Sequence, residues 1–245
     1  MEIMKEKEII EKYNYLDDDN VIFMNDGYCP LDEDGYPTKM DIQLTEKYRP
    51  WRYQVYMYKL LMDFIKIDSE KSKEKTILDV GCGRAGGLSF YQDYYQFKSL
   101  HGVDLNPEHK RVAQTHTDIE VHTSSATSLP FNSKSFDIIT CVESSPYYHP
   151  FESYVSEIKR ILKPGGIYVR AERYIQTPDY FLNDDFIQVK YIDINHNSRI
   201  SCSISKWTTL QSSEKMSRVL FGDEEEYIEN RTTYNVTSYI KKTLD

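Results

Sequence analysis

The sequence lacks the features of a secreted or membrane-spanning protein. Its four cysteines lie far apart, without a C-x-x-C pair or a His/Cys cluster at zinc-binding spacing. No stretch approaches the roughly 18 consecutive apolar residues of a membrane span, and the charged N-terminus does not resemble a secretory signal. We therefore expect a cytoplasmic protein with reduced thiols, no metal site and no membrane partner.

Basic residues are also fewer than acidic ones. The chain has 30 Lys and Arg residues against 39 Asp and Glu residues, which gives a net charge of −9. An acidic chain gains little from long-range attraction to a phosphate backbone, so we expect no nucleic-acid partner. The neighbouring acids Asp32, Glu33 and Asp34 fall in an irregular segment, where such a run is usually solvated and does not predict a metal site.

Glycine is scarce overall but concentrated in one place. The chain has 10 glycines, and Gly81, Gly83 and Gly86 form a G-x-G-x-x-G pattern between a predicted strand and a predicted helix. Glycine permits a tight turn and close approach of a ligand, and the start of a helix presents free N–H groups. Asp104 ends the next predicted strand, about 20 residues further on, as expected of an acid that binds ribose hydroxyls. The pattern predicts a nucleoside-binding turn.

An acid just ahead of this turn bears on the choice of ligand. Asp79 would repel the pyrophosphate of a dinucleotide but attract a ligand that carries an ammonium group. S-adenosylmethionine carries both an ammonium and a sulfonium group. A dinucleotide, and a glycine-rich turn without any ligand, remain the alternatives.

Strands and helices alternate with short connections over the central part of the chain. This order predicts an α/β fold with a doubly wound, mostly parallel sheet and helices on both faces. Strands are expected at 76–81, 99–105, 119–125, 135–143 and 166–174, and helices at 85–97, 107–116 and 150–162.

The flanking parts of the chain have a different pattern. We expect helices at 1–20, 51–67 and 205–220, and an antiparallel last strand or hairpin around Asn235. The predicted organisation is a helical N-terminal lid at 1–70, a ligand-binding core at 71–175, and an acceptor-side cap with the final strands at 176–245.

Four segments of the core resemble, in order, the motifs of class I S-adenosylmethionine (SAM)-dependent methyltransferases. They are ILDVGCGRAGG, GVDLNP, ATSLPFNSKSFDIITCVESS and EIKRILKPGGIYVRAE. The resemblance implies a Rossmann-like fold, SAM as cofactor and S-adenosylhomocysteine as product. It places Gly81, Cys82 and Gly83 at the methionine portion and Asp104 at the ribose. The residues that it implies around the cofactor are Asp79, Gly81, Cys82, Gly83, Asp104, Leu105, Ser125, Ala126 and Glu143.

Three further segments resemble a narrower group, the natural-product O-methyltransferases of the phthiotriol dimycocerosate and rebeccamycin type. They are FMNDGYCP, RYQVYMY and VESSPYYHPF. The resemblance implies methylation of a hydroxyl on a small, natural-product-like molecule. It also implies that Tyr28 and Tyr53 of the N-terminal segment close over the cofactor. Tyr147, Tyr148 and Tyr174 are the expected wall of the acceptor site.

A hydroxyl acceptor benefits from a general base. Pro146 stands where these relatives have a histidine, so we predict that His149 acts as the base and Glu172 orients it. An amine, or the carboxylate of a modified peptide, is an alternative acceptor. A non-catalytic SAM-binding regulator and a dinucleotide-dependent oxidoreductase are alternative functions. The expected partner is a small molecule or short peptide, bound by a monomer or homodimer.

Overall fold

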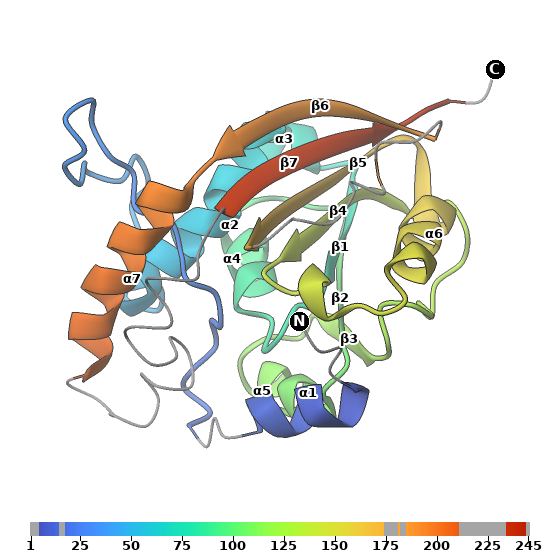
Figure 1. Cartoon of the computed structure of the whole chain (residues 1–245), viewed down its shortest axis with the longest axis horizontal. Coiled ribbons are helices and arrows are strands. Elements are labelled where there is room, and N and C mark those ends of the chain that lie inside the picture. The colour runs from blue at the N-terminus through green and yellow to red at the C-terminus, as the bar shows by residue number, and fades with distance from the viewer. Residues whose placement is uncertain (1–4, 15–17, 174–180, 182–184, 211–233, 244–245) are drawn as a thin grey trace.

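A single sheet organises the chain (Figure 1). The computed structural model describes residues 5–14, 18–173, 181, 185–210 and 234–243. Its strands are β1 (Thr76–Val80), β2 (Ser99–Asp104), β3 (Glu120–Thr123), β4 (Phe136–Val142), β5 (Leu162–Arg173), β6 (Phe186–Asp193) and β7 (Tyr234–Lys241). Its helices are α1 (Glu6–Tyr13), η1 (Arg49–Trp51), α2 (Arg52–Phe64), α3 (Ser69–Ser72), α4 (Gly86–Tyr94), α5 (Pro107–His116), η2 (Ser145–Tyr147), α6 (Phe151–Ile161) and α7 (Asn195–Leu210).

The sheet has the strand order β3-β2-β1-β4-β5-β7-β6. β1 pairs in parallel with β2 and β4, and the parallel ladder continues to β3 on one side and to β5 on the other. β7 is antiparallel to both of its neighbours, β5 and β6. The predicted mostly parallel sheet with an antiparallel last strand is therefore confirmed.

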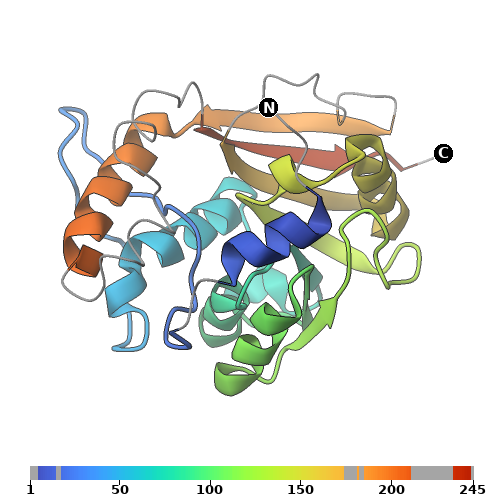
Figure 2. The same ribbon diagram turned by 60° about the horizontal axis from the view of Figure 1, so that its bottom comes forward.

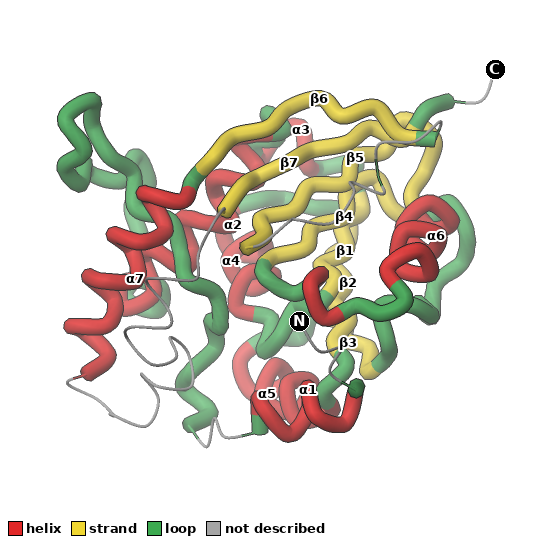
Figure 3. The backbone as a smooth tube through the Cα atoms, in the orientation of Figure 1, coloured by secondary structure: helices red, strands yellow, loops and turns green. Residues whose placement is uncertain are grey.

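Helices cover both faces of the sheet (Figure 3). Apolar side chains of α2, α4 and α5 form one core cluster with one face of the sheet, and those of α6 form a second cluster with the other face. β1 touches both layers, because Ile77 belongs to the first cluster and Leu78 to the second. Burial on both faces explains why the central strands are nearly continuous apolar runs.

Two helices lie outside these layers, as Figure 2 shows. α1 crosses the molecule beside α5, and α7 lies beside α2. The side chain of Asn197 in α7 donates to the carbonyl of Cys29 at 2.9 Å, and the Ser201 hydroxyl donates to the carbonyl of Asp26 at 2.8 Å. α7 therefore holds the segment that connects α1 to α2. None of the described helices combines the length and apolar sequence needed to span a bilayer.

The C-terminal part differs most from expectation. The helix predicted at 205–220 begins ten residues earlier, at Asn195, and residues 211–220 lie outside the described part of the chain. β6 was not predicted. β7 runs through Asn235 as one strand, because both of its edges are paired. The division into three segments at residues 70 and 175 stays a prediction.

Candidate functional site

The turn after β1 is held by its own backbone. Gly81 and Gly83 have φ angles of +71° and +53°, which favour glycine. The N–H groups of Gly81 and Cys82 both donate to the carbonyl of Val103 in β2, at 2.8 and 3.0 Å. A side chain at position 81 would also collide with Ser144 and Tyr148 of the loop after β4. The turn is thereby fixed against the ends of two neighbouring strands.

Gly86 and Gly87, at the start of α4, line the cavity and also allow close packing. A methyl group on Gly86 would meet the backbone of Ile22, and one on Gly87 would meet the ring of Tyr58. These glycines let the N-terminal segment and α2 pack closely on α4.

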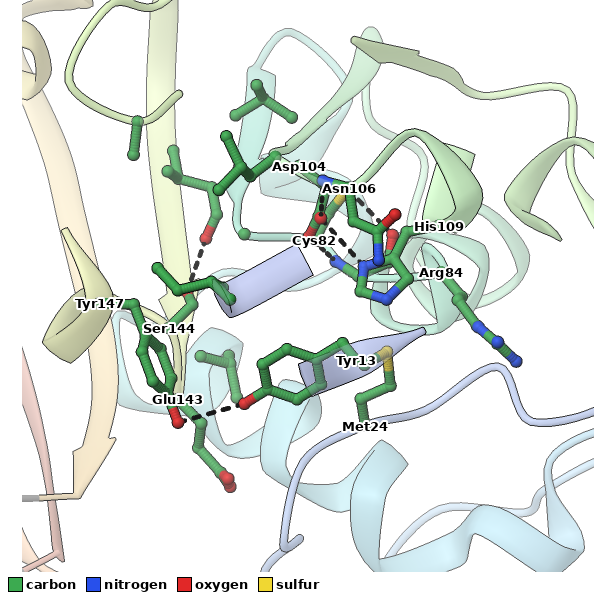
Figure 4. A pocket seen from close by; sticks show the side chains of 18 of the residues that line it. Tyr13, Met24, Cys82, Arg84, Asp104, Asn106, His109, Glu143, Ser144 and Tyr147 are labelled. Carbon is green, nitrogen blue, oxygen red and sulfur yellow. Dashed lines mark hydrogen bonds and ion pairs between the residues drawn. The ribbon is translucent and has the colours of Figure 1, made fainter. Parts of the chain in front are cut away.

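A cavity of about 560 Å³ opens at the carboxyl ends of β1, β2 and β4 (Figure 4). In open α/β sheets this edge is where ligands bind. The predicted site residues that line it are Gly81, Cys82, Gly83, Asp104, Leu105, Ser125, Ala126, Glu143, Tyr147, Tyr148 and His149. The topology thus brings together residues that are up to 68 positions apart in the sequence.

Asp104 connects β2 to the glycine turn. One carboxylate oxygen accepts from the N–H of Gly83 at 2.8 Å. The other accepts from the N–H of Asn106 and lies 2.9 Å from Nδ1 of His109. A carboxylate offers about four acceptor positions, so one remains for a ligand. Nε2 of His109 is buried and makes no hydrogen bond among the described residues.

The N-terminal helix forms another wall of the cavity (Figure 4). Ile9, Ile10 and Tyr13 of α1 line it, as does Met24. The hydroxyl of Tyr13 donates to that of Tyr147 at 3.2 Å, and its ring packs edge-on against His109. α1 therefore bridges the loop after β4 and the start of α5, and it presents apolar side chains to the cavity.

Glu143 is the second carboxylate of the cavity wall. It follows β4 with a φ angle of +54°, which is uncommon for a residue other than glycine. Its Oε1 accepts from the N–H of Asp26 at 2.7 Å and from the hydroxyl of Tyr234 at 2.6 Å. These bonds tie the N-terminal segment and β7 to the end of β4.

Asp79 does not line the cavity. Its side chain is 1% exposed and lies behind Tyr58, whose hydroxyl faces it at 3.5 Å, while the Thr140 hydroxyl donates to it at 2.7 Å. Burial raises the pKa of Asp79 to about 7, and the two hydrogen bonds oppose the shift.

Two predicted tyrosines also lie away from the cavity in the described part of the chain. Tyr28 stacks on Tyr56 with ring centroids 5.9 Å apart, and the carbonyl of Tyr53 accepts from the N–H of Tyr28. Both residues attach the N-terminal segment to α2. Tyr174 falls outside the described residues.

Glu172 is fully buried beneath the cavity. Its Oε1 accepts from the N–H of Ser145 at 3.1 Å and from the thiol of Cys141 at 3.2 Å, whereas its Oε2 has no partner among the described residues. Burial raises the pKa of Glu172 to about 7, against the hydrogen bonds and the positive charge of Arg170. A carboxyl group with this pKa exchanges protons near neutrality.

A chain of polar contacts joins Glu172 to the cavity. Cys141 Sγ lies 3.2 Å from Ser144 Oγ, and Ser144 accepts from the hydroxyl of Tyr148 at 2.8 Å and donates to the carbonyl of Val80 at 3.1 Å. Tyr148 lines the cavity. His149 lies at the exposed rim, and no hydrogen bond joins it to Glu172 within the described residues.

Several lining residues were missed from the sequence. Tyr13, Tyr58 and His109 reach the cavity from α1, α2 and α5. The apolar pair Ile9–Ile10 marked α1 as amphipathic, but its sequence does not say which surface it covers. His109 faces Asp104 because the strand ends next to the first turn of α5, a relationship that spacing alone does not reveal.

Residues 78–169 match the methyltransferase domain family. Among curated proteins, the chain is 32% identical over 160 residues to a fatty-acid O-methyltransferase of Mycolicibacterium smegmatis, an alignment that covers 64% of this chain and 54% of that protein. It is 29% identical over 151 residues to a phthiotriol/phenolphthiotriol dimycocerosates methyltransferase of Mycobacterium leprae, covering 60% of this chain and 52% of that protein. The chain thus spans about half the length of the curated relatives it matches.

Solved structures share the whole architecture at low sequence identity. The [4+2]-cyclase SpnF superposes with a TM-score of 0.71 at 15% identity, covering 100% of this chain and 99% of that one. Geranyl diphosphate C-methyltransferase from Streptomyces coelicolor A3(2) gives 0.69 at 17% identity, covering 96% and 97%. At this identity the likeness defines the fold and leaves the reaction to the residues of the site.

Proposed function

Because the chain carries a methyltransferase domain in the class I fold, we propose that it binds SAM and transfers the methyl group to a small acceptor. The proposal rests on one observation: the glycine turn, Asp104 and Ser125–Ala126 line a single cavity at the carboxyl edge of the sheet. The cavity is large enough for a nucleoside with an amino-acid tail and a second small molecule.

Each part of the cofactor has a proposed place. The free acceptor position of Asp104 takes a ribose hydroxyl, and Leu105, Ser125 and Ala126 surround the adenine. The turn at Gly81–Gly83 takes the methionine portion. Asp104 and Glu143 place carboxylates at the ends of β2 and β4, which favour a cationic group over a pyrophosphate beside the turn. Glu6, Lys5, Lys7 and Arg84 also line the cavity, and the guanidinium of Arg84 donates to the carbonyls of Asp18 and Val21. In this arrangement Asp79 accepts a hydrogen bond from Tyr58, and Tyr58 is the residue that lines the cavity.

We propose that the acceptor offers oxygen, on a molecule with a substantial apolar part. Ile9, Ile10 and Met24 supply apolar area on the side of the cavity formed by the N-terminal segment. The names of the two curated relatives, which cite a fatty acid and phthiotriol, favour such an acceptor. A carboxylate acceptor needs no base, whereas a hydroxyl acceptor must lose a proton.

For a hydroxyl acceptor, we propose Glu172 as the final proton acceptor. As the new O–CH₃ bond forms and the S–CH₃ bond of SAM breaks, the hydroxyl proton passes to the oxygen of Tyr148. Tyr148 passes its own proton to Ser144. The Ser144 hydroxyl turns from the carbonyl of Val80 to Cys141 and passes its proton there, and the thiol proton of Cys141 protonates Glu172. The distances of 2.8, 3.2 and 3.2 Å along this chain support the route. In this scheme the exposed His149 contacts the acceptor as it enters the cavity and takes no part in the proton transfer.

Calorimetric titration with S-adenosylhomocysteine tests cofactor binding, with NAD as the control ligand. We expect micromolar binding of S-adenosylhomocysteine, loss of that binding in Asp104→Asn, and wild-type binding in the matched surface variant Asp34→Asn. Binding of NAD alone, or of neither ligand, would overturn the proposal.

A methyl-transfer assay then separates the acceptors. Wild-type protein with labelled SAM is offered fatty acids, aliphatic and phenolic alcohols, amines and short peptides, and products are identified by mass spectrometry. Methyl esters are cleaved by alkali and methyl ethers are not, so the two oxygen acceptors are distinguished directly. Cofactor binding without transfer to any of these would favour the non-catalytic alternative. A cytoplasmic location and a monomeric or homodimeric state stay predictions.

A further inference from the structure

Two histidines and a glutamate meet at the edge of the sheet farthest from β6. His101 lies on β2, and Glu120 and His122 lie on β3, the edge strand (Figure 3). His101 is the register partner of Glu120, and Glu120 and His122 point to the same face because they are two residues apart on a strand. The backbone ladder therefore brings the three side chains together.

The geometry of these side chains points to a metal site. His101 Nδ1 lies 3.5 Å from one oxygen of Glu120, and His122 Nε2 lies 3.3 Å from the other. One ligand atom from each of the three residues falls within 4.8 Å of the others. The edges of a tetrahedron with Zn–N and Zn–O bonds of 2.0–2.1 Å measure about 3.3 Å. The two measured separations, 3.5 and 3.3 Å, are close to this value but involve different oxygens of Glu120, so the exposed Glu120 carboxylate must rotate to bring one oxygen to both rings.

The surroundings also suit a metal ligand set. Nδ1 of His101 is buried, and the Glu120 carboxylate, 3.5 Å away, is an ion-pair partner at the limit of hydrogen-bond distance. The ring of Phe131 packs edge-on against His122 at 5.0 Å and against His101 at 6.1 Å. Phe131 restricts the rotation of both imidazole rings. The Glu120 side chain is 62% exposed, which leaves a coordination position of the metal open to water.

We propose that His101, Glu120 and His122 bind a zinc-class divalent cation. Imidazole and carboxylate ligands in this number suit Zn²⁺, whereas Mg²⁺ and Ca²⁺ prefer oxygen ligands. The sequence predicted no metal site, because the ligands come from two strands and share no motif spacing. The ion would fasten β3 to β2 near the ends that carry Ser125 and Asp104, without contact with the cavity.

Calorimetry on tag-free, chelator-treated full chain tests the site with Zn²⁺ as the probe and Mg²⁺ as the comparison ion. We expect one Zn²⁺ per chain with micromolar or tighter affinity, a rise in Tm with Zn²⁺, and no response to Mg²⁺. Glu120→Gln and His122→Gln should each weaken Zn²⁺ binding at least tenfold. His196→Gln, which alters an exposed histidine at the start of α7, should bind as the wild type does.

Cobalt substitution supplies an independent readout of geometry. Co²⁺ in the wild-type site should give the intense visible absorption of four-coordinate cobalt, and Glu120→Gln should lose it. Glu120 is mostly exposed, so this variant keeps its fold even if His122→Gln does not. Absence of Zn²⁺ binding, wild-type affinity in both variants, or only the weak spectrum of six-coordinate cobalt would overturn the proposal.

Discussion

The hydroxyl of Tyr13 lies 3.2 Å from the hydroxyl of Tyr147, so a hydrogen bond joins the first helix to the loop after β4. The two residues are 134 positions apart in the sequence. Both line the cavity, so a ligand bound there lies beside this contact. The contact therefore bears on the rates of binding and release.

Removing this hydrogen bond should speed ligand release. A net hydrogen bond contributes about 0.5–1.5 kcal/mol, so Tyr13→Phe should dissociate S-adenosylhomocysteine about twofold to tenfold faster. Tyr147→Phe should have the same effect, and the double variant should be no faster than either single one. Stopped-flow dissociation measures all three, with the exposed Tyr36→Phe as control. Additive effects of the two changes would show that the residues act separately.

Gly87→Ala should destabilise the protein although alanine is the better helix former. Helix propensity alone predicts a gain of about 1 kcal/mol. The added methyl group would collide with the ring of Tyr58, and overpacking of this kind costs about 1–3 kcal/mol. Urea denaturation measures the change in unfolding free energy. Tyr58→Leu should reduce the effect of Gly87→Ala, and an equal loss in both backgrounds would contradict the collision.

The buried carboxyl of Glu172 should make stability fall as pH rises. Its pKa is about 7 in the folded protein against an ordinary value of 4.5, so the folded state holds the proton more tightly than the unfolded state. The associated stabilisation is complete below pH 4.5 and is lost as pH rises through 7. Its size is on the order of 3 kcal/mol.

Denaturation at pH 5 and pH 8 checks this dependence. The loss of unfolding free energy between the two values should be smaller in Glu172→Gln than in the wild type. The exposed Glu74→Gln should behave as the wild type does. Asp79 contributes in the same direction because its pKa is also about 7, so part of the slope should remain in Glu172→Gln.

The same group should set the pH dependence of turnover with a hydroxyl acceptor. Because Glu172 must be ionised to take the proton, kcat should rise with pH and level off above about 7. Ser144→Ala interrupts the route and should lower kcat by roughly 10²–10⁴-fold with little change in cofactor affinity. With a carboxylate acceptor, Ser144→Ala should leave kcat nearly unchanged. Equal losses with both acceptors would show a structural role only.

The central fold followed from the sequence because its signals are local. Buried strands such as Thr76–Val80 are short apolar runs, and Asn106–Pro107 marks a helix start that the structure places at Pro107. The match of residues 78–169 to the methyltransferase domain family confirms the resemblance of the core, and the solved structures share the predicted fold.

The sequence was less informative where long-range contacts decide the structure. The sequence of β6 alternates apolar and polar residues. Ile187 and Val189 are nevertheless about half exposed, because β6 is an edge strand. The alternation therefore does not indicate a buried face. The place of Asp79 at the ligand stays a prediction; the contact between its carboxylate and the hydroxyl of Tyr58, 3.5 Å away on α2, could not be read from the sequence. The ligand set of the proposed metal site is likewise a product of strand pairing between β2 and β3.

The position of β7 sets the order in which the sheet can be assembled. β7 is the last strand of this chain, but it lies between β5 and β6. During synthesis, β6 emerges from the ribosome with no strand to pair with, and the far edge of β5 stays open until the residues after 233 have appeared. Pairing over such sequence distances is slow, and open strand edges are prone to aggregation. A nascent chain stalled before β7 therefore exposes two unpaired edges at once, which makes this junction a natural point for chaperone attachment.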